Sequence, residues 1–176
     1  MRVTKLAKAL AMVTIQDLAP EHFELVARWL SKPEINRWLA AEWRNRAVSS
    51  TLIAIAARNR RNRLFLVRYN AQPCGLVALA DITAADKTAM MWYVLGEGEL
   101  SGRGITSEAV IQLTRFCFAE VGLSSVYAWT VEDNMASRRV LQKAGLREAG
   151  RIRCAASSAG RQVDRIYFDL IASEVR

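Results

Sequence analysis

The amino-acid sequence predicts a single α+β domain in which helices flank a mixed β-sheet. The chain has 176 residues, of which 52% are hydrophobic and 24% are charged, so it can bury a sizeable core as one domain. Strand-like apolar stretches dominate both halves, with stretches of helical spacing between them. The sequence has no internal repeat, low-complexity tract or interdomain linker. No apolar run approaches the length that spans a bilayer, so no membrane partner is expected.

The first half of the chain predicts four strands, with helices between the first two. Residues 13–18 alternate apolar and polar side chains, as a half-buried strand does. Helical segments are expected from Pro20, over residues 34–39 and then 42–46, and over residues 48–58. Strands are expected over residues 64–69, 76–81 and 89–95, separated by loops at residues 70–75 and 83–88.

The second half predicts a long helix, a strand, a short helix and two final strands. Apolar residues at helical spacing indicate a helix over residues 105–121, followed by a strand over residues 125–131. A helix over residues 134–144 ends at Gly145, a natural C-terminal stop. The last strands are expected over residues 146–155 and 163–171, around a turn at residues 157–161.

The N-terminal stretch and the cysteines bear on the compartment. Residues 1–11 mix basic and small apolar residues, but lysines interrupt any apolar core, so we interpret them as a short leader before a domain over residues 12–176. Cys74, Cys117 and Cys154 are widely spaced and form neither a Cys-x-x-Cys pair nor a metal-ligand pattern. These features favour a reducing cytoplasm, and no metal is expected.

The net charge of +8 favours an anionic partner. Nucleic acid, an acidic protein and a phosphorylated small molecule all satisfy that condition. Arginines cluster over residues 58–63, which is either a binding patch or a solvated loop between a helix and a strand. Aromatic residues are not interleaved with the cluster, as stacking on single-stranded RNA would require, so the solvated loop is favoured.

A glycine loop over residues 99–108 organises the chain, because it joins a predicted strand to a predicted helix. Glycines at a helix N-terminus let backbone N–H groups converge on an anion, so the loop is a candidate phosphate cradle. An ordinary strand-to-helix turn is the alternative. The sequence has no Walker loop, and Gly102-Arg-Gly104 is followed by Ser107 where a dinucleotide-binding fingerprint has its third glycine.

The stretch Ser101-Gly-Arg-Gly-Ile-Thr-Ser-Glu-Ala109 resembles the acyl-CoA pyrophosphate loop of the GNAT superfamily, the general N-acetyltransferases. That loop reads Gln/Arg-x-x-Gly-x-Gly/Ala, so Ser101 and Thr106 depart from it while Gly104 matches. The stretch from Asn134 to Leu146 resembles the second signature, Asn-x-x-Ala/Ser with a short helix and Lys-x-Gly-Phe. The resemblance covers roughly residues 12–171 and is nearest the RimJ/RimL-like branch, which implies a mostly antiparallel sheet.

The resemblance implies a binding site for acetyl-CoA. In this superfamily a central strand splays from its neighbour, and its backbone holds the pantetheine arm and the acyl carbonyl, while the loop holds the pyrophosphate. Asn134 resembles a residue that contacts the pantetheine arm, although a plain helix N-cap is the alternative. The remaining implied donor residues are Tyr93, Val94 and Leu95 on the strand, and Arg103, Gly104, Ile105, Thr106 and Ser107 in the loop.

Candidate catalytic residues also follow from the resemblance. Many members use a tyrosine of the short helix as the acid that protonates the leaving thiolate, but Leu141 holds that position here. Ser137 matches a serine proposed to replace it, and helix capping is its alternative role. Glu97, which follows the predicted central strand, is our first choice of base, with Asp81, Tyr93 and Glu132 as further options.

The resulting hypothesis is a cytoplasmic N-acetyltransferase that moves an acetyl group from acetyl-CoA directly to a primary amine. The acceptor is a small metabolite, an amino sugar or a protein N-terminus, and Trp38 and Trp43 are candidates for its binding wall. A homodimer is left open, and a nucleic-acid partner is not favoured. The alternative is a basic RNA- or ribosome-associated binding protein that has the fold but no turnover, as the charge and the missing tyrosine would allow.

Overall fold

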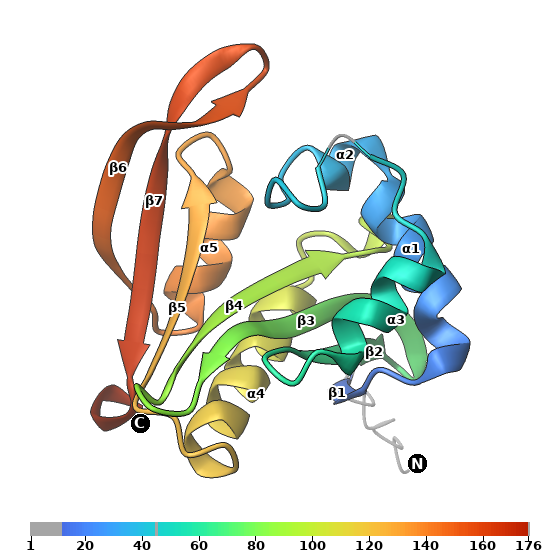
Figure 1. Cartoon of the computed structure of the whole chain (residues 1–176), viewed down its shortest axis with the longest axis horizontal. Coiled ribbons are helices and arrows are strands. Elements are labelled where there is room, and N and C mark those ends of the chain that lie inside the picture. The colour runs from blue at the N-terminus through green and yellow to red at the C-terminus, as the bar shows by residue number, and fades with distance from the viewer. Residues whose placement is uncertain (1–11, 45, 176) are drawn as a thin grey trace, which may run out of the picture.

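The computed structural model describes residues 12–44 and 46–175, so the expected leader at residues 1–11 lies outside the described residues. Its centre is a sheet in the order β1-β2-β3-β4-β5-β7-β6 (Figure 1). All neighbouring strands are antiparallel except β4 and β5, which are parallel. The expected α+β domain with a mixed, mostly antiparallel sheet and flanking helices is therefore confirmed.

The helices and strands lie close to their expected positions. The strands are β1 (Val13–Asp17), β2 (Arg63–Tyr69), β3 (Gln72–Thr83), β4 (Thr88–Leu95), β5 (Ser125–Val131), β6 (Arg147–Ser158) and β7 (Arg161–Ile171). The helices are α1 (Phe23–Ser31), α2 (Pro33–Asn36), α3 (Ser50–Arg58), α4 (Ile105–Ala119) and α5 (Met135–Lys143). Short 3₁₀ turns cover Pro20–His22, Gly98–Leu100 and Ala172–Glu174.

The larger differences from the sequence expectation lie at the β2–β3 turn, after α2 and in the final hairpin. The expected loop over residues 70–75 is a tight turn at Asn70 and Ala71, both with positive φ, so β3 begins at Gln72. Such turns suit the twist of paired strands, and the register shifts between Val67 and Arg68, where Cys74 is an extra residue on β3. The helical segment at residues 34–39 ends at Asn36, and the described part of 42–46 forms turns rather than a helix. The final hairpin is longer than expected because the chain reverses at Ala159 and Gly160, again with positive φ.

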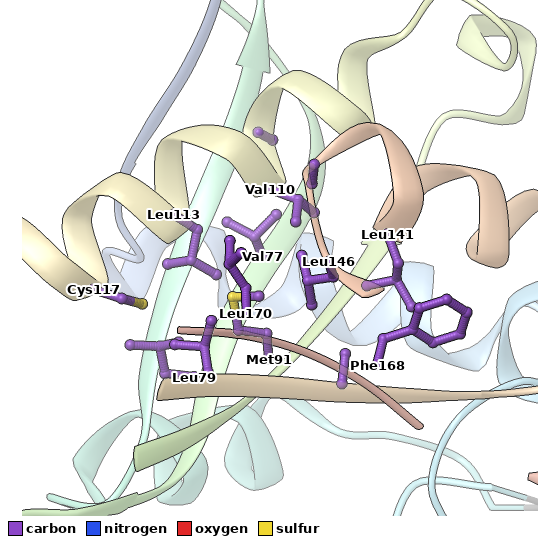
Figure 2. Packing of buried hydrophobic residues seen from close by; sticks show 14 of the residues in the cluster. Val77, Leu79, Met91, Val110, Leu113, Cys117, Leu141, Leu146, Phe168 and Leu170 are labelled. Atoms are coloured by element: carbon purple, nitrogen blue, oxygen red, sulfur yellow. The ribbon is translucent and has the colours of Figure 1, made fainter. Parts of the chain in front are cut away.

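Each face of the sheet carries its own core. Alternate residues of β3 point to opposite faces, so Val77 packs with α4 and α5 while Leu76 packs with α1 and α3. Figure 2 shows the first core, in which Leu113 of α4 faces Val77 and Met91 of the sheet. Trp29 and Cys117 are among the buried residues of these two cores, with exposed fractions of 1% and 0%.

The parallel pair at the centre of the sheet opens into a gap. β4 pairs with β5 only where Thr88–Met90 meets Ser125–Tyr127, although both strands continue for several residues beyond that point. The two arrows diverge in Figure 1, with α5 and the β6–β7 hairpin on one side of the opening and α2 near its end. Within the described ranges no helix combines the length and the apolar character that crossing a bilayer requires.

Candidate active site

A cavity of about 830 Å³ occupies the gap between β4 and β5. The two strands, the glycine loop, the first turn of α4, and α5 form one part of its wall. The segment around α2 and the ends of α3 and β3 form the rest. The lining includes these residues named from the sequence: Tyr93, Val94, Leu95, Gly104, Ile105, Thr106, Ser107, Asn134, Ser137, Trp38 and Trp43.

The glycine loop leaves an open, N–H-lined space at the start of α4. Gly102 and Gly104 have φ values of +80° and +79°, which L side chains rarely adopt. A Cβ on either glycine would meet no atom within 4 Å, so the space beside the backbone is free for a ligand. The first intrahelical bond joins Glu108 N–H to the Gly104 carbonyl at 3.0 Å, so the N–H groups of residues 105–107 are those that a helix start leaves for an anion.

The loop residues differ in their position relative to the cavity. Ser101, Gly102, Thr106 and Ser107 all line it. Arg103 is exposed and is absent from the lining. The cradle is therefore made of backbone and small side chains, which suits the pyrophosphate of acyl-CoA.

Beyond Met90, the edge of β4 that faces the gap has backbone N–H and C=O groups that do not pair with β5. Antiparallel strands direct the N–H and C=O of alternate residues to their partner. Gly96 N–H donates to the Cys74 carbonyl on β3 at 2.7 Å. By this alternation, the backbone groups of Tyr93 and Leu95 turn to the gap, where a pantetheine arm with amide groups could pair with them.

Tyr93 and Ser137 form a polar contact across the cavity wall. The Tyr93 hydroxyl lies 2.8 Å from Ser137 Oγ and 3.1 Å from the Ser137 carbonyl oxygen. The Ser137 N–H donates to Asn134 Oδ1 at 3.1 Å, so Asn134 is the N-cap of α5 and lines the cavity as well. Burial raises the pKa of the Tyr93 phenol, and the hydrogen bond to Ser137 lowers it by a smaller amount. The phenol therefore stays protonated at neutral pH.

Sequence reasoning missed the contact that the Tyr93 side chain makes with Ser137. Tyr93 was named for its backbone, and as a weak candidate base, but not as a partner of Ser137. The two residues are 44 positions apart and come from β4 and α5. In the sequence, the only sign of this contact is a tyrosine on the strand that precedes the glycine loop. The contact between Tyr93 and Ser137 depends on how α5 packs against β4, which the sequence pattern does not reveal.

Leu141, which replaces the tyrosine of many superfamily members, belongs to the core. Its side chain is fully buried, and Figure 2 shows it beside Phe168 under α5. Both residues are part of the cluster beneath α4 and α5. The substitution therefore removes a hydroxyl from this position of α5, and Tyr93 supplies the phenol that lines the cavity.

Glu97 lies beside the sheet rather than in the cavity lining. Trp29 Nε1 donates to Glu97 Oε1 at 2.7 Å, and Lys32 Nζ lies 3.9 Å from Oε2. Lys32 Nζ also donates to the Gly96 carbonyl at 2.6 Å. The Glu97 carboxylate thus fastens the end of β4 to α1, and this geometry does not present it to an acceptor amine. Glu132 likewise accepts a backbone bond, from Asp164 N–H at 3.2 Å.

The α2 side of the cavity is aromatic. Trp43 and Trp92 have ring centroids 5.9 Å apart at an interplanar angle of 36°. Trp38 packs on Val131, Ala156 and Val163, so the α2 segment meets β5 and the β6–β7 hairpin across the gap. Trp129 completes this wall and was not identified from the sequence, nor was Trp92. Both were read as strand residues, and only the splay of β4 from β5 turns them into cavity walls.

The fold and the cavity together define a class. A parallel pair that splays at the centre of an antiparallel sheet, with a glycine loop and helix start at the gap, is the acyl-CoA-binding arrangement that the sequence resemblance implied. The model of the acetyltransferase (GNAT) domain matches residues 13–147. The chain therefore belongs to the GNAT acetyltransferase family.

Individual relatives agree with this assignment. The chain is 27% identical over 106 residues to the putative ribosomal N-acetyltransferase YdaF of Bacillus subtilis (strain 168). The aligned residues cover 60% of this chain and 57% of that protein. It is 36% identical over 77 residues to the probable N-acetyltransferase YjcK of the same organism, covering 43% and 42%. The matches thus span about half the length of these curated relatives. The first agrees with the expected likeness to the RimJ/RimL-like branch.

Solved structures share the fold. A spermidine N-acetyltransferase from Vibrio cholerae in complex with CoA and spermine superposes with a TM-score of 0.82 at 16% identity, covering 93% of this chain and 97% of that one. RimJ of Mycobacterium smegmatis in complex with CoA-disulfide superposes with a TM-score of 0.77 at 21% identity, covering 93% and 83%. At these identities the likeness establishes the fold.

Proposed function

We propose that this chain is an N-acetyltransferase that moves an acetyl group from acetyl-CoA directly to a primary amine. One observation carries the proposal. A single cavity in the gap between β4 and β5 extends from the glycine loop and the N-terminus of α4 to the aromatic wall formed by Trp43 and Trp92. Membership in an acetyltransferase family and the N-acetyltransferase names of the relatives support it.

The donor end of the cavity has the groups that acetyl-CoA needs. The N–H groups of residues 105–107 would hold the pyrophosphate, and the free edge of β4 at Tyr93 and Leu95 would hold the pantetheine arm. Arg139 and Lys143 line the same end from α5 and add positive charge for the remaining phosphate. Acetyl-CoA, as co-substrate, would supply the activated acetyl group.

The Tyr93–Ser137 pair can assist the leaving thiolate. When the Tyr93 hydroxyl donates to Ser137 Oγ, the Ser137 proton is free to point to another acceptor in the cavity. A hydrogen bond from Ser137 to the sulfur stabilises the negative charge that grows there as the thioester breaks. Because burial keeps the Tyr93 phenol neutral, the pair acts as an oriented donor rather than as a source of a free proton.

Acceptor, location and assembly belong to the same proposal. A small amine or amino sugar and a protein N-terminus both carry the required primary amine, and the relatives include a putative ribosomal acetyltransferase. Free thiols at Cys74, Cys117 and Cys154 suit a cytoplasmic location. If a homodimer forms, the edge strand β6, where Ile152 is 51% exposed, is the surface on which we expect a second copy to pair.

Titration with acetyl-CoA tests the donor. Saturable heat and a rise in melting temperature are expected, because a ligand at 100 times its Kd stabilises the folded state by about 2.7 kcal/mol. An amine screen with detection of the released thiol then tests transfer. A folded protein that neither binds acetyl-CoA nor releases thiol, but binds RNA with a steep salt dependence, would instead support the non-catalytic alternative.

A further inference from the structure

Lys32 lies at the junction between α1 and the α2 segment, which comprises residues 33–44. Its N–H donates to the Trp29 carbonyl at 3.1 Å and closes α1, and its carbonyl accepts from Asn36 N–H at 2.8 Å and opens α2. Pro33, the first residue of α2, favours the extended backbone that Lys32 adopts, with φ −62° and ψ 125°. The direction in which the α2 segment leaves α1 is therefore set at this one residue.

The α2 segment is too short to hold its own position. The helix α2 has four residues, and turns follow it. The Asn36 side-chain amide donates to the Leu30 carbonyl and to the Trp43 carbonyl, each at 2.9 Å, so it ties these turns to the end of α1. The segment and the end of α1 are thus held together as one piece, and the distance of this piece from β4 depends on the contacts that it makes with that strand.

The Lys32 side chain makes such a contact. Its ammonium donates to the Gly96 carbonyl at 2.6 Å and lies 3.9 Å from the Glu97 carboxylate. The N–H groups of Gly96 and Glu97 both donate to the Cys74 carbonyl of β3, at 2.7 and 3.2 Å, so two residues oppose one, as in a β-bulge. The bond from the Trp29 indole to Glu97 adds a second restraint. Lys32 therefore binds a fixed point at the end of β4, and it does so with a charged donor, which strengthens the hydrogen bond.

The distance between the α2 segment and β4 sets the width of the aromatic part of the cavity. Trp43 of the segment and Trp92 of β4 lie beside each other there, with ring centroids 5.9 Å apart. Lys32 is not a lining residue, so it can influence an acceptor only through that distance. We propose that Lys32 is a positioning residue, which holds the aromatic wall at the separation that the acceptor amine requires. This inference rests on the proposed function, since it concerns the acceptor of the same reaction.

Removing the ammonium of Lys32 tests the inference. Lys32→Met keeps the hydrocarbon stem but cannot donate to Gly96. With hexylamine as the acceptor, we expect KM to rise about fivefold, kcat to fall less than about twofold, and acetyl-CoA affinity by calorimetry to stay constant. Lys32→Arg restores a charged donor and should recover KM to within about twofold of wild type. Lys87→Met, at an exposed lysine outside the cavity lining, is the control and should keep the wild-type KM.

Glu97→Gln is a second variant that tests the same contact. Glutamine keeps an oxygen for the Trp29 indole N–H but removes the charge beside Lys32, so KM for hexylamine should rise about twofold while kcat is retained. A fall in kcat of about a hundredfold would instead identify Glu97 as the general base and would overturn its part in positioning.

Hydrogen exchange gives a readout that needs no turnover. The backbone amides of residues 33–44 should exchange faster in Lys32→Met, while those of β4 keep their protection. The inference is overturned if exchange and KM are both unchanged, or if acetyl-CoA affinity falls as much as KM rises. Failure of the proposed function looks different, because then no amine releases thiol from acetyl-CoA. The role of Lys32 toward an acceptor would fail with it, whereas exchange would still report whether Lys32 holds the segment.

Discussion

The proposed donor and acceptor ends of the cavity are built in different ways. The donor end uses backbone: two glycines with positive φ, a helix start, a strand edge and an N-cap. The acceptor end uses large side chains that come from the turns after α2, from β4 and from β5, which are far apart in the sequence. Backbone sites depend on local conformation and so leave a motif, whereas side-chain walls depend on the assembled fold.

β4 separates the two ends and belongs to both. Its neighbouring residues point to opposite faces, so Tyr93 reaches Ser137 on α5 while Trp92 meets Trp43 of the α2 segment. The end of β4 is fastened to α1 through Glu97, Trp29 and Lys32. A change on one face can thus be separated experimentally from a change on the other.

The largest expected effect comes from a change at Gly96, which directly follows β4. A Cβ on Gly96 would overlap the Trp29 indole, which is 1% exposed and cannot move without breaking its bond to Glu97. Gly96→Ala should therefore lower the free energy of unfolding by about 3 kcal/mol, measured by urea denaturation. Gly98→Ala is the matched control, because a Cβ there meets nothing within 4 Å. Equal stability of the two variants would show that β4 is not fixed by α1.

The next effect isolates the donor cradle. Gly104→Val and Gly122→Val place a β-branched side chain at φ values of +79° and +73°, with no atom within 4 Å of either Cβ. Each should cost about 1–2 kcal/mol of stability because the left-handed conformation is strained. Only Gly104→Val fills the cavity, and it should weaken acetyl-CoA binding at least about tenfold by calorimetry. Similar affinity in both variants would place the pyrophosphate elsewhere.

A smaller effect is expected where the donor wall meets the chemistry. Tyr93→Phe removes the partner of Ser137 Oγ, and Ser137→Ala removes the hydroxyl itself, so either should lower kcat about tenfold with little change in acetyl-CoA affinity. If the hydroxyls act as one unit, the double variant should be no slower than the slower single variant. Additive losses would mean that the two groups act independently.

The pH dependence of the Tyr93→Phe variant follows from the burial of the Tyr93 phenol. Because the pKa of Tyr93 is raised above its ordinary value of 10.0, the phenol stays protonated across pH 7 to 9. The pH–rate profiles of wild type and Tyr93→Phe should therefore have the same shape over that range, differing only in height. The folded protein also holds this proton more tightly than the unfolded chain, so wild type should lose stability above about pH 10 and Tyr93→Phe should lose less. A titration near pH 8 that disappears in Tyr93→Phe would contradict the effect of burial.

The sequence predicted the features that depend on local conformation and missed those that depend on how distant segments pack. The strands, the long helix and the glycine loop were predicted because periodicity and turn residues act locally, as at Gly104 and Gly145. The start of β3 was wrong because Pro73 and Gly75 suggest a loop, while the positive φ values that form the turn belong to Asn70 and Ala71. Glu97 looked like a base because it follows the central strand. Its bond to Trp29, 68 positions away, depends on how α1 packs and has no local signal.

The smallest expected effect tests the acceptor wall alone. Trp43→Leu keeps an apolar side chain beside Trp92 but removes the indole face, so acceptor KM should rise about threefold while acetyl-CoA affinity stays constant. Initial rates at saturating acetyl-CoA, together with calorimetry of the donor, measure the two quantities separately. A loss of donor affinity in this variant would mean that the two faces of β4 are coupled. In that case the acceptor pocket could not change in evolution without cost to the cradle, and the separation between backbone-built and side-chain-built ends would not hold.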